Sequence, residues 1–210
     1  MQRYPVAGTA LSVCVLLAGC GSKELTRSKA ATLIKQQLIR DGVNRMQDKL
    51  VLGDFEVPYP TVEGWVHDDQ GGRLYATFAK KKLVGLTLKG TVTRQVYKGS
   101  FGAMEPKEFG TINVQLTDEG KRYVMGDGGI DNGHKYVPIV MCEQVLDSIT
   151  GITLEGSNQT ARVEYKLKLV NPTPFALAES EWAGRPICSP ELIDRSLMFR
   201  LFDDGWRIGN

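Results

Sequence analysis

The strictest pattern in the sequence is an alternation of apolar and charged side chains in "ARVEYKLKLV", residues 161–170. A period of two residues predicts a β-strand that buries one face and exposes the other to water. The buried face is assigned to Ala161, Val163, Tyr165, Leu167 and Leu169, and the exposed face to Arg162, Glu164, Lys166 and Lys168. Because a half-buried strand needs partners, this segment predicts an antiparallel sheet in the last third of the chain.

Other segments supply the neighbouring strands. "YVPIVMCEQVLDSITGI" (136–152) is apolar on both faces at first, which predicts a long, bent strand. "SLMFRLFDDGWRI" (196–208) predicts two strands around an Asp-Gly turn. "LTLKGTVTRQVY" (86–97) and "GTINVQL" (110–116) predict a further pair of strands.

Helical patterns occur in the first half of the chain. In residues 25–42, Ala30, Ile34 and Leu38 recur at a spacing of four, with Thr26 or Ser28 as the cap and Gly42 as the stop. Residues 72–86 predict a second helix, and residues 116–124 a short helix or turn. The fold class expected is therefore α+β, with a helical part over 20–125 followed by a curved antiparallel sheet over 126–210, as one domain or two.

Two weak resemblances accompany this division. Over residues 28–125, the order of two helices, a hairpin and the phrase "VQLTDEG" resembles a winged-helix unit. The last third is similar in style to curved-sheet domains of the cystatin or NTF2 type, whose final strand often carries a pair like Gly205-Trp206. Neither resemblance implies an activity.

The N-terminal segment predicts export from the cytoplasm. Arg3 precedes an apolar run from Val6 to Gly19. This run is shorter than the ~20 residues that a membrane-spanning helix needs, so residues 1–19 are assigned to a signal peptide. An ordinary signal peptide and a buried helix are the alternatives.

The end of the run, Leu17-Ala18-Gly19-Cys20, resembles the lipobox of bacterial lipoproteins. The resemblance implies that acyl lipid is attached to Cys20, that residues 1–19 are removed, and that the chain is held at a bilayer. Family members with Asp after the cysteine tend to stay in the inner membrane, whereas Gly21-Ser22 follows here. The resemblance therefore favours the outer membrane and its periplasmic face over the inner membrane.

The charge distribution bears on the partner. Residues 21–50 contain seven basic and three acidic groups, whereas residues 51–210 contain 18 basic and 21 acidic groups. A basic segment next to a lipid anchor can rest on anionic head groups; the alternative is a solvated helix face. A winged helix in the cytoplasm can bind DNA through groups such as Lys80, Lys81, Lys82 and Lys89, but an exported protein meets no chromosome, so no nucleic-acid partner is expected.

Once Cys14 and Cys20 are assigned to the leader and the anchor, Cys142 and Cys188 remain. An exported domain permits a disulfide, which would contribute about 4 kcal/mol in the chain-entropy model. Two separate thiols are the alternative.

The sequence contains few residues that could act in catalysis. His67 and His134 are the histidines, and a Cys188–His134 nucleophile pair is conceivable without any supporting motif. The glycine-rich segment with Asp127, Asp131, Asn132 and His134 lacks the register of a calcium loop, so a hairpin loop is expected and no metal or other cofactor. The aromatic residues considered for a binding surface, most of them assigned to the core, are Tyr59, Trp65, Phe175, Trp182 and Trp206.

These observations predict a lipid-anchored, non-catalytic binding or assembly module. Its expected partners are the bilayer, through the acyl chain, and a protein or cell-wall component of the envelope. An envelope hydrolase acting on the cell wall is the alternative.

Overall fold

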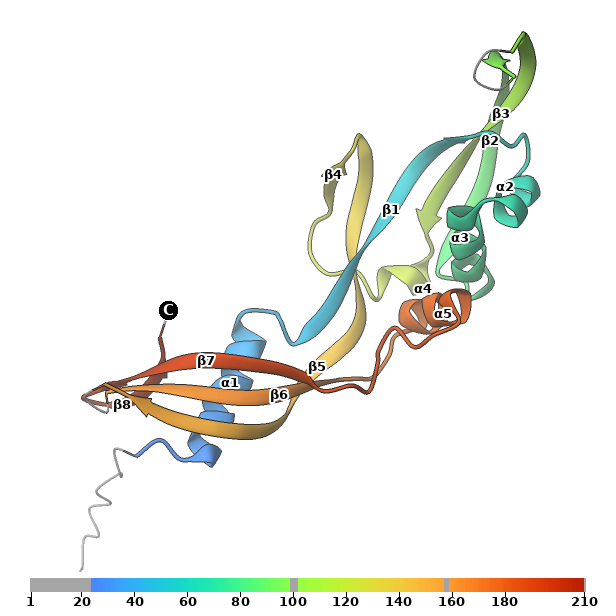
Figure 1. Cartoon of the computed structure of the whole chain (residues 1–210). Coiled ribbons are helices and arrows are strands. Elements are labelled where there is room, and N and C mark those ends of the chain that lie inside the picture. Colours follow the sequence, from blue (N-terminus) through green and yellow to red (C-terminus); the bar gives the residue numbers. More distant parts are fainter. Residues whose placement is uncertain (1–23, 99–101, 157–158, 210) are drawn as a thin grey trace, which may run out of the picture.

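The computed structural model describes residues 24–98, 102–156 and 159–209 and contains an elongated, curved antiparallel sheet flanked by helices (Figure 1). The helices of the described residues are α1 (Arg27–Arg40), α2 (Val62–Asp68), α3 (Gln70–Lys80), α4 (Asp118–Lys121) and α5 (Pro174–Ala183). The strands are β1 (Arg45–Val57), β2 (Val84–Tyr97), β3 (Met104–Leu116), β4 (Gly129–Asp131), β5 (His134–Glu155), β6 (Thr160–Val170), β7 (Ile193–Phe202) and β8 (Gly205–Ile208). The predicted α+β class is confirmed.

The strand order of the sheet is β2-β3-β1-β5-β6-β7-β8, with β4 paired to β5 outside this path. Strand β1 changes its neighbour along its length. Residues 45–52 pair with β5, whereas residues 53–57 pair with β3. The change of partner occurs at Gly53, whose φ of +100° lies in the region that favours glycine. The pairing with β5 ends here, and from Gly53 onward β1 continues beside β3 (Figure 1).

Two hydrophobic clusters cover the sheet. The first joins β1, β3 and β5 to α2, α3 and α5, and its fully buried side chains include Phe175, Leu83 and Met141. The second joins α1 to β6, β7 and β8. Each cluster takes residues from both sides of position 125. The division into 20–125 and 126–210 stays a prediction.

The amphipathic helix predicted after residue 25 is confirmed as α1. Thr26 caps its start by accepting a hydrogen bond from the Lys29 N–H at 3.2 Å. The predicted stripe of Ala30, Ile34 and Leu38 is buried against the second cluster. The helix thus covers one face of the β5–β8 part of the sheet (Figure 1).

The strands predicted from periodicity are also confirmed. Ala161, Val163, Tyr165 and Leu167 are buried in β6 as the alternation requires. The long apolar segment forms β5, whose register with β6 shifts at residues 147 and 150. Such bulges add local twist, which accounts for the bend of a strand this long.

A disulfide joins Cys142 in β5 to Cys188 beyond α5, with their Cα atoms 6.1 Å apart. This settles the choice between a bridge and two thiols. Thr173, which caps α5, adds two hydrogen bonds to the same part of β5: its N–H to the Met141 carbonyl at 2.9 Å and its hydroxyl to the Val140 carbonyl at 2.7 Å. Both ends of the α5 segment are therefore held against β5.

The prediction of a mainly helical part over residues 20–125 is wrong. Strands β1, β2 and β3 are longer than the helices of this range except α1, since β1 and β3 have 13 residues each and β2 has 14. Helix α2 was not predicted. Helix α1 packs in the second cluster, whereas α2 and α3 pack in the first. The structure therefore does not confirm a winged-helix unit, in which the helices share one core.

The aromatic packing of the first cluster gives a test of the fold. Phe175 is fully buried, and its ring centroid lies 5.2 Å from that of Phe78 and 6.2 Å from that of Tyr123. Phe175→Ala is expected to lower the free energy of unfolding by about 3–5 kcal/mol, because the cavity cannot close fully. In the same helix, Leu177 is 51% exposed, and Leu177→Ala should change it by less than about 0.5 kcal/mol. Urea denaturation measures both; equal effects would contradict this packing.

Candidate interaction surface

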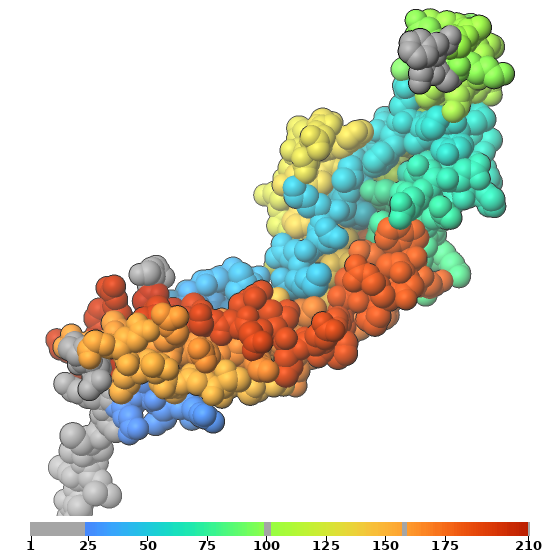
Figure 2. All heavy atoms as spheres, in the orientation of Figure 1, coloured from blue at the N-terminus to red at the C-terminus, as the bar shows by residue number. Residues whose placement is uncertain are grey.

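The β2–β3 hairpin extends beyond the rest of the sheet. The pairing of β1 with β3 ends at Val57 opposite Gly110, whereas the pairing of β2 with β3 continues to Tyr97 opposite Met104. We call the described part of this extension, residues 91–98 and 102–109, the arm. At ~3.3 Å per residue, residues 91–97 project roughly 20 Å past the end of β1, and Figures 1 and 2 show this hairpin at one extreme of the molecule.

The base of the arm depends on Gly110. A Cβ atom at this position would lie 2.4 Å from the carbonyl oxygen of Tyr59. The chain that leaves β1 through Pro58 and Pro60 therefore crosses directly over the arm's base, which only glycine permits. This contact fixes where the free part of the hairpin begins.

Ion pairs across β3 set the direction of the arm. Lys89 of β2 contacts the Asp54 carboxylate of β1 at 2.9 Å, and Arg94 contacts the Glu56 carboxylate at 2.6 Å. The buried Asn113 lies between the first pair and donates a hydrogen bond to Asp54 at 2.5 Å. Each pair is half-exposed and therefore weakened by solvent screening, but together they join the two strands that flank β3.

Apolar side chains are exposed on both faces of the arm. Tyr97 is 69% exposed and Met104, directly opposite, is 54% exposed. On the other face Val92 lies opposite Phe109. The guanidinium carbon of Arg94 and the ammonium of Lys107 each lie 5.9 Å from the Phe109 ring centroid. Exposed apolar side chains on a projecting ribbon are typical of a surface that another molecule covers.

The second hairpin, β4–β5, contains the glycine-rich segment examined for metal binding. Asn132 and Gly133, both with positive φ, form its two-residue turn, as expected for a hairpin loop. Asp131 pairs with Lys49 at 2.7 Å, and the His134 ring stacks on Phe55 with centroids 5.3 Å apart. Within residues 24–98, 102–156 and 159–209, no group of His, Cys, Asp and Glu is placed to hold a metal ion.

The structure rules out Cys188 and His134 as a nucleophile and its base. The Cys188 sulfur is bonded to Cys142 and offers no thiolate, while His134 stacks on Phe55 in the β4–β5 hairpin. His67 lies in α2, with its ring exposed and its Nδ1 2.7 Å from the Asp68 carboxylate.

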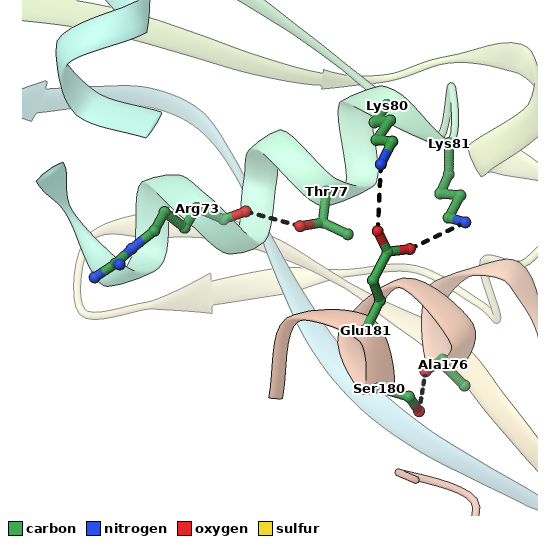
Figure 3. A network of polar contacts seen from close by, with 7 residues as sticks. All are labelled: Arg73, Thr77, Lys80, Lys81, Ala176, Ser180 and Glu181. Atoms are coloured by element: carbon green, nitrogen blue, oxygen red, sulfur yellow. Dashed lines mark hydrogen bonds and ion pairs between the residues drawn. The ribbon is translucent and has the colours of Figure 1, made fainter. Parts of the chain in front are cut away.

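Three of the four lysines considered for nucleic-acid contact, Lys80, Lys81 and Lys89, take part in intramolecular ion pairs. Lys80 and Lys81 approach the two oxygens of Glu181 at 3.3 and 3.1 Å, which ties the end of α3 to α5 (Figure 3). These pairs lower the pKa of Glu181, with the hydrogen bond from Lys81 as the largest cause. The same figure shows Thr77 and Ser180 turned back to carbonyls of their own helices. This region is a helix–helix contact.

Most of the aromatic residues proposed for a binding surface lie in the core. Trp65, Phe175 and Trp206 are buried, and Tyr59 and Trp182 are half-buried. Tyr97, Met104 and Phe109 were not predicted as residues of a binding surface. The feature that could have predicted them is the length of β2 and β3, because these strands continue past the residues that pair with β1.

Cys20 and the rest of Leu17-Ala18-Gly19-Cys20 lie outside the described residues. Among those described, no helix is both long enough and apolar enough to cross a bilayer. Comparisons of the chain with protein-family models, curated proteins and solved structures gave no match.

The ion pairs at the arm's base predict a pH effect. The hydrogen bonds from Lys89 and then Asn113 lower the pKa of Asp54 below its ordinary value of 3.8. A lowered pKa means that the charged carboxylate favours the folded state, so this stabilisation is present above the ordinary value and is lost as the pH falls through the lowered one. Lys89→Met should raise the pKa of Asp54, measured by carbon-13 NMR titration. Lys98→Met, at the far end of the arm, is the control; equal shifts would contradict the assignment.

Proposed function

We propose that the chain is a lipid-anchored envelope protein, a non-catalytic binding module that holds the arm away from a membrane. One observation carries the proposal. The described chain begins beside α1 at one end of the molecule, and the arm with its exposed Tyr97 and Met104 lies at the opposite end (Figure 1). A molecule tethered at the first end presents the second to its surroundings.

The proximity of Cys20 to the folded part supports this arrangement. Leu25 is already buried in the second cluster. Five residues span at most roughly 18 Å when fully extended, so a lipid on Cys20 would keep α1 and β8 close to the head groups. Two or more acyl chains give stable anchoring without a spanning helix.

Helix α1 carries the charge that such a position favours. Its basic residues are Arg27, Lys29, Lys35 and Arg40, and its sequence contains no acidic residue. Lys35 and Arg40 are exposed, as is Ile39 beside them. Each basic group near an anionic surface contributes about 1 kcal/mol of attraction. This supports the interpretation of the basic segment as a membrane-facing surface rather than a solvated helix face.

The proposed location is the periplasmic face of the outer membrane, on the argument from Gly21-Ser22. The partner proposed for the arm is a protein or a cell-wall component of the envelope. The exposed apolar pairs of the arm support binding, since they gain from being covered by a partner.

The anchoring is tested by Cys20→Ala in the full chain. The variant should incorporate no labelled fatty acid and should leave the membrane fraction for the soluble one, because the acyl chains supply the anchoring energy. Ser22→Ala, two residues away, is the matched control and should behave as the wild type. Retained lipid labelling of the Cys20→Ala chain would refute the lipoprotein proposal.

The arm is tested by site-specific photocrosslinking in the envelope. A benzophenone side chain at position 97 or 104 should give one discrete crosslinked species, because these positions are covered by the partner. The same group at Leu154, which is as exposed as Met104 but lies in β5, should give none. Equal crosslinking at all three positions would refute the arm as the binding surface. Release of soluble cell-wall fragments by the purified domain would favour the envelope hydrolase.

A further inference from the structure

A cavity lies between helices α3 and α5, and none of the described residues that line it belongs to the arm. Its volume is about 480 Å³, within the range of roughly 300–1,000 Å³ that is typical of small-ligand sites. We call it the α3–α5 cavity. Its lining residues, from α3, from α5 and from the segment that follows α5, are Gln70, Arg73, Trp182, Ala183 and Arg185. This lining contains two positive charges and no negative one.

Both guanidinium groups of the lining are unpaired. At the far end of α3, Lys80 and Lys81 bind Glu181, whereas the Arg73 side chain extends away from that contact (Figure 3). Within residues 24–98, 102–156 and 159–209, the guanidinium of neither Arg73 nor Arg185 has a hydrogen bond or an ion pair. Two guanidiniums that line one cavity repel each other, and a bound anion would replace this repulsion with attraction.

The acidic residues around these helices do not neutralise the two arginines. The Asp69 carboxylate caps α3 and accepts a backbone hydrogen bond there at 2.8 Å. Glu181 binds the two lysines. Glu179 is close enough for Arg185 to lower its pKa, but burial, the largest cause, keeps this pKa raised overall. Arg185 is therefore not committed to Glu179 as an ion-pair partner.

Arg185 is attached to a fixed segment of backbone. Gly184, with a φ of +65°, ends α5 in the left-handed conformation. Two residues after the arginine, the Ile187 N–H donates to the Ser180 hydroxyl at 2.9 Å, and Cys188 is then held by the disulfide to β5. The backbone is thus fixed on both sides of Arg185, so less conformational freedom is lost when its side chain binds a ligand.

The side chains of the cavity define the class of ligand. A guanidinium binds two oxygens of a carboxylate or a phosphate through two parallel N–H donors. The Gln70 amide adds further donors. The half-buried Trp182 provides an aromatic surface on which a ring can pack.

We propose that the α3–α5 cavity binds a small molecule that carries an oxyanion, a carboxylate or a phosphate, on a ring. Arg73 and Arg185 bind the oxyanion, and Trp182 contacts the ring. This site adds a second binding function to the one proposed for the arm and does not depend on the lipid anchor.

NMR titration of the purified full chain with benzoate and with phenyl phosphate tests the inference. At millimolar concentration, at least one of these anions should shift the signals of the Trp182 indole N–H and of the Arg73 and Arg185 Nε–H groups in a saturable way. Benzamide, which has the same ring without a charge, should not shift them. The anion that binds more tightly identifies the group that the cavity accepts. No saturable shift with either anion, or equal shifts with benzamide, would overturn the inference.

Two variants separate the cavity from the general charge of the protein. Arg73→Gln and Arg185→Gln should each weaken binding of the tighter anion at least tenfold, because hydrogen bonds to a charged group are lost. Arg40→Gln, which removes an exposed arginine of α1, is the control and should leave binding within about twofold. Equal weakening by all three variants would contradict the assignment of the site.

The midpoint of urea denaturation distinguishes a binding role from a structural one. Neither guanidinium makes a contact within the described fold, so Arg73→Gln and Arg185→Gln should keep the wild-type midpoint. Loss of binding together with a lowered midpoint would assign the arginines to the fold and overturn the inference. Photocrosslinking from position 97 or 104 reports on the arm alone, so failure of either test leaves the other proposal standing.

Discussion

The structure depends on the double pairing of strand β1. Its first part pairs with β5 and its last part with β3, and the change occurs at Gly53. No other strand in the described part of the chain lies between the β2–β3 hairpin and the remaining strands. The hydrogen bonds of β1 therefore connect the part of the sheet that carries the second cluster and α1 to the hairpin that forms the arm.

The arm exists because the pairing of β1 with β3 stops at Gly110, whereas the pairing of β2 with β3 continues to Met104. Pro58 and Pro60 follow the last paired residue, Val57, and proline cannot continue a ladder. Beyond that point β2 and β3 have only each other, so both faces of the ribbon are open to water. Two-stranded ribbons are marginal on their own. Here the ion pairs of Lys89 and Arg94 with β1 support the base.

Much of the fold was predictable from local pattern. The stripe of α1, the alternation of β6 and the length of β5 each follow from burial at a fixed period, and each is confirmed. Strand β1 was not recognised, because the burial of its side chains follows neither the helical period nor the strand period. The strand changes partner at Gly53 and has a bulge after Met46. The helix α2 was missed because its seven residues, VEGWVHD, are too few to show a helical period.

The sequence by itself determined the elements with a clear period, such as α1 and β6, since each requires only a periodic match between side chains and one buried face. It contains four cysteines but does not show that Cys142 and Cys188 meet. The tertiary structure alone decided which strands are neighbours, where β1 stops covering β3, and hence that Tyr97 and Met104 are exposed. These outcomes depend on contacts between distant segments, and the pattern of one segment does not show which distant strand pairs with it.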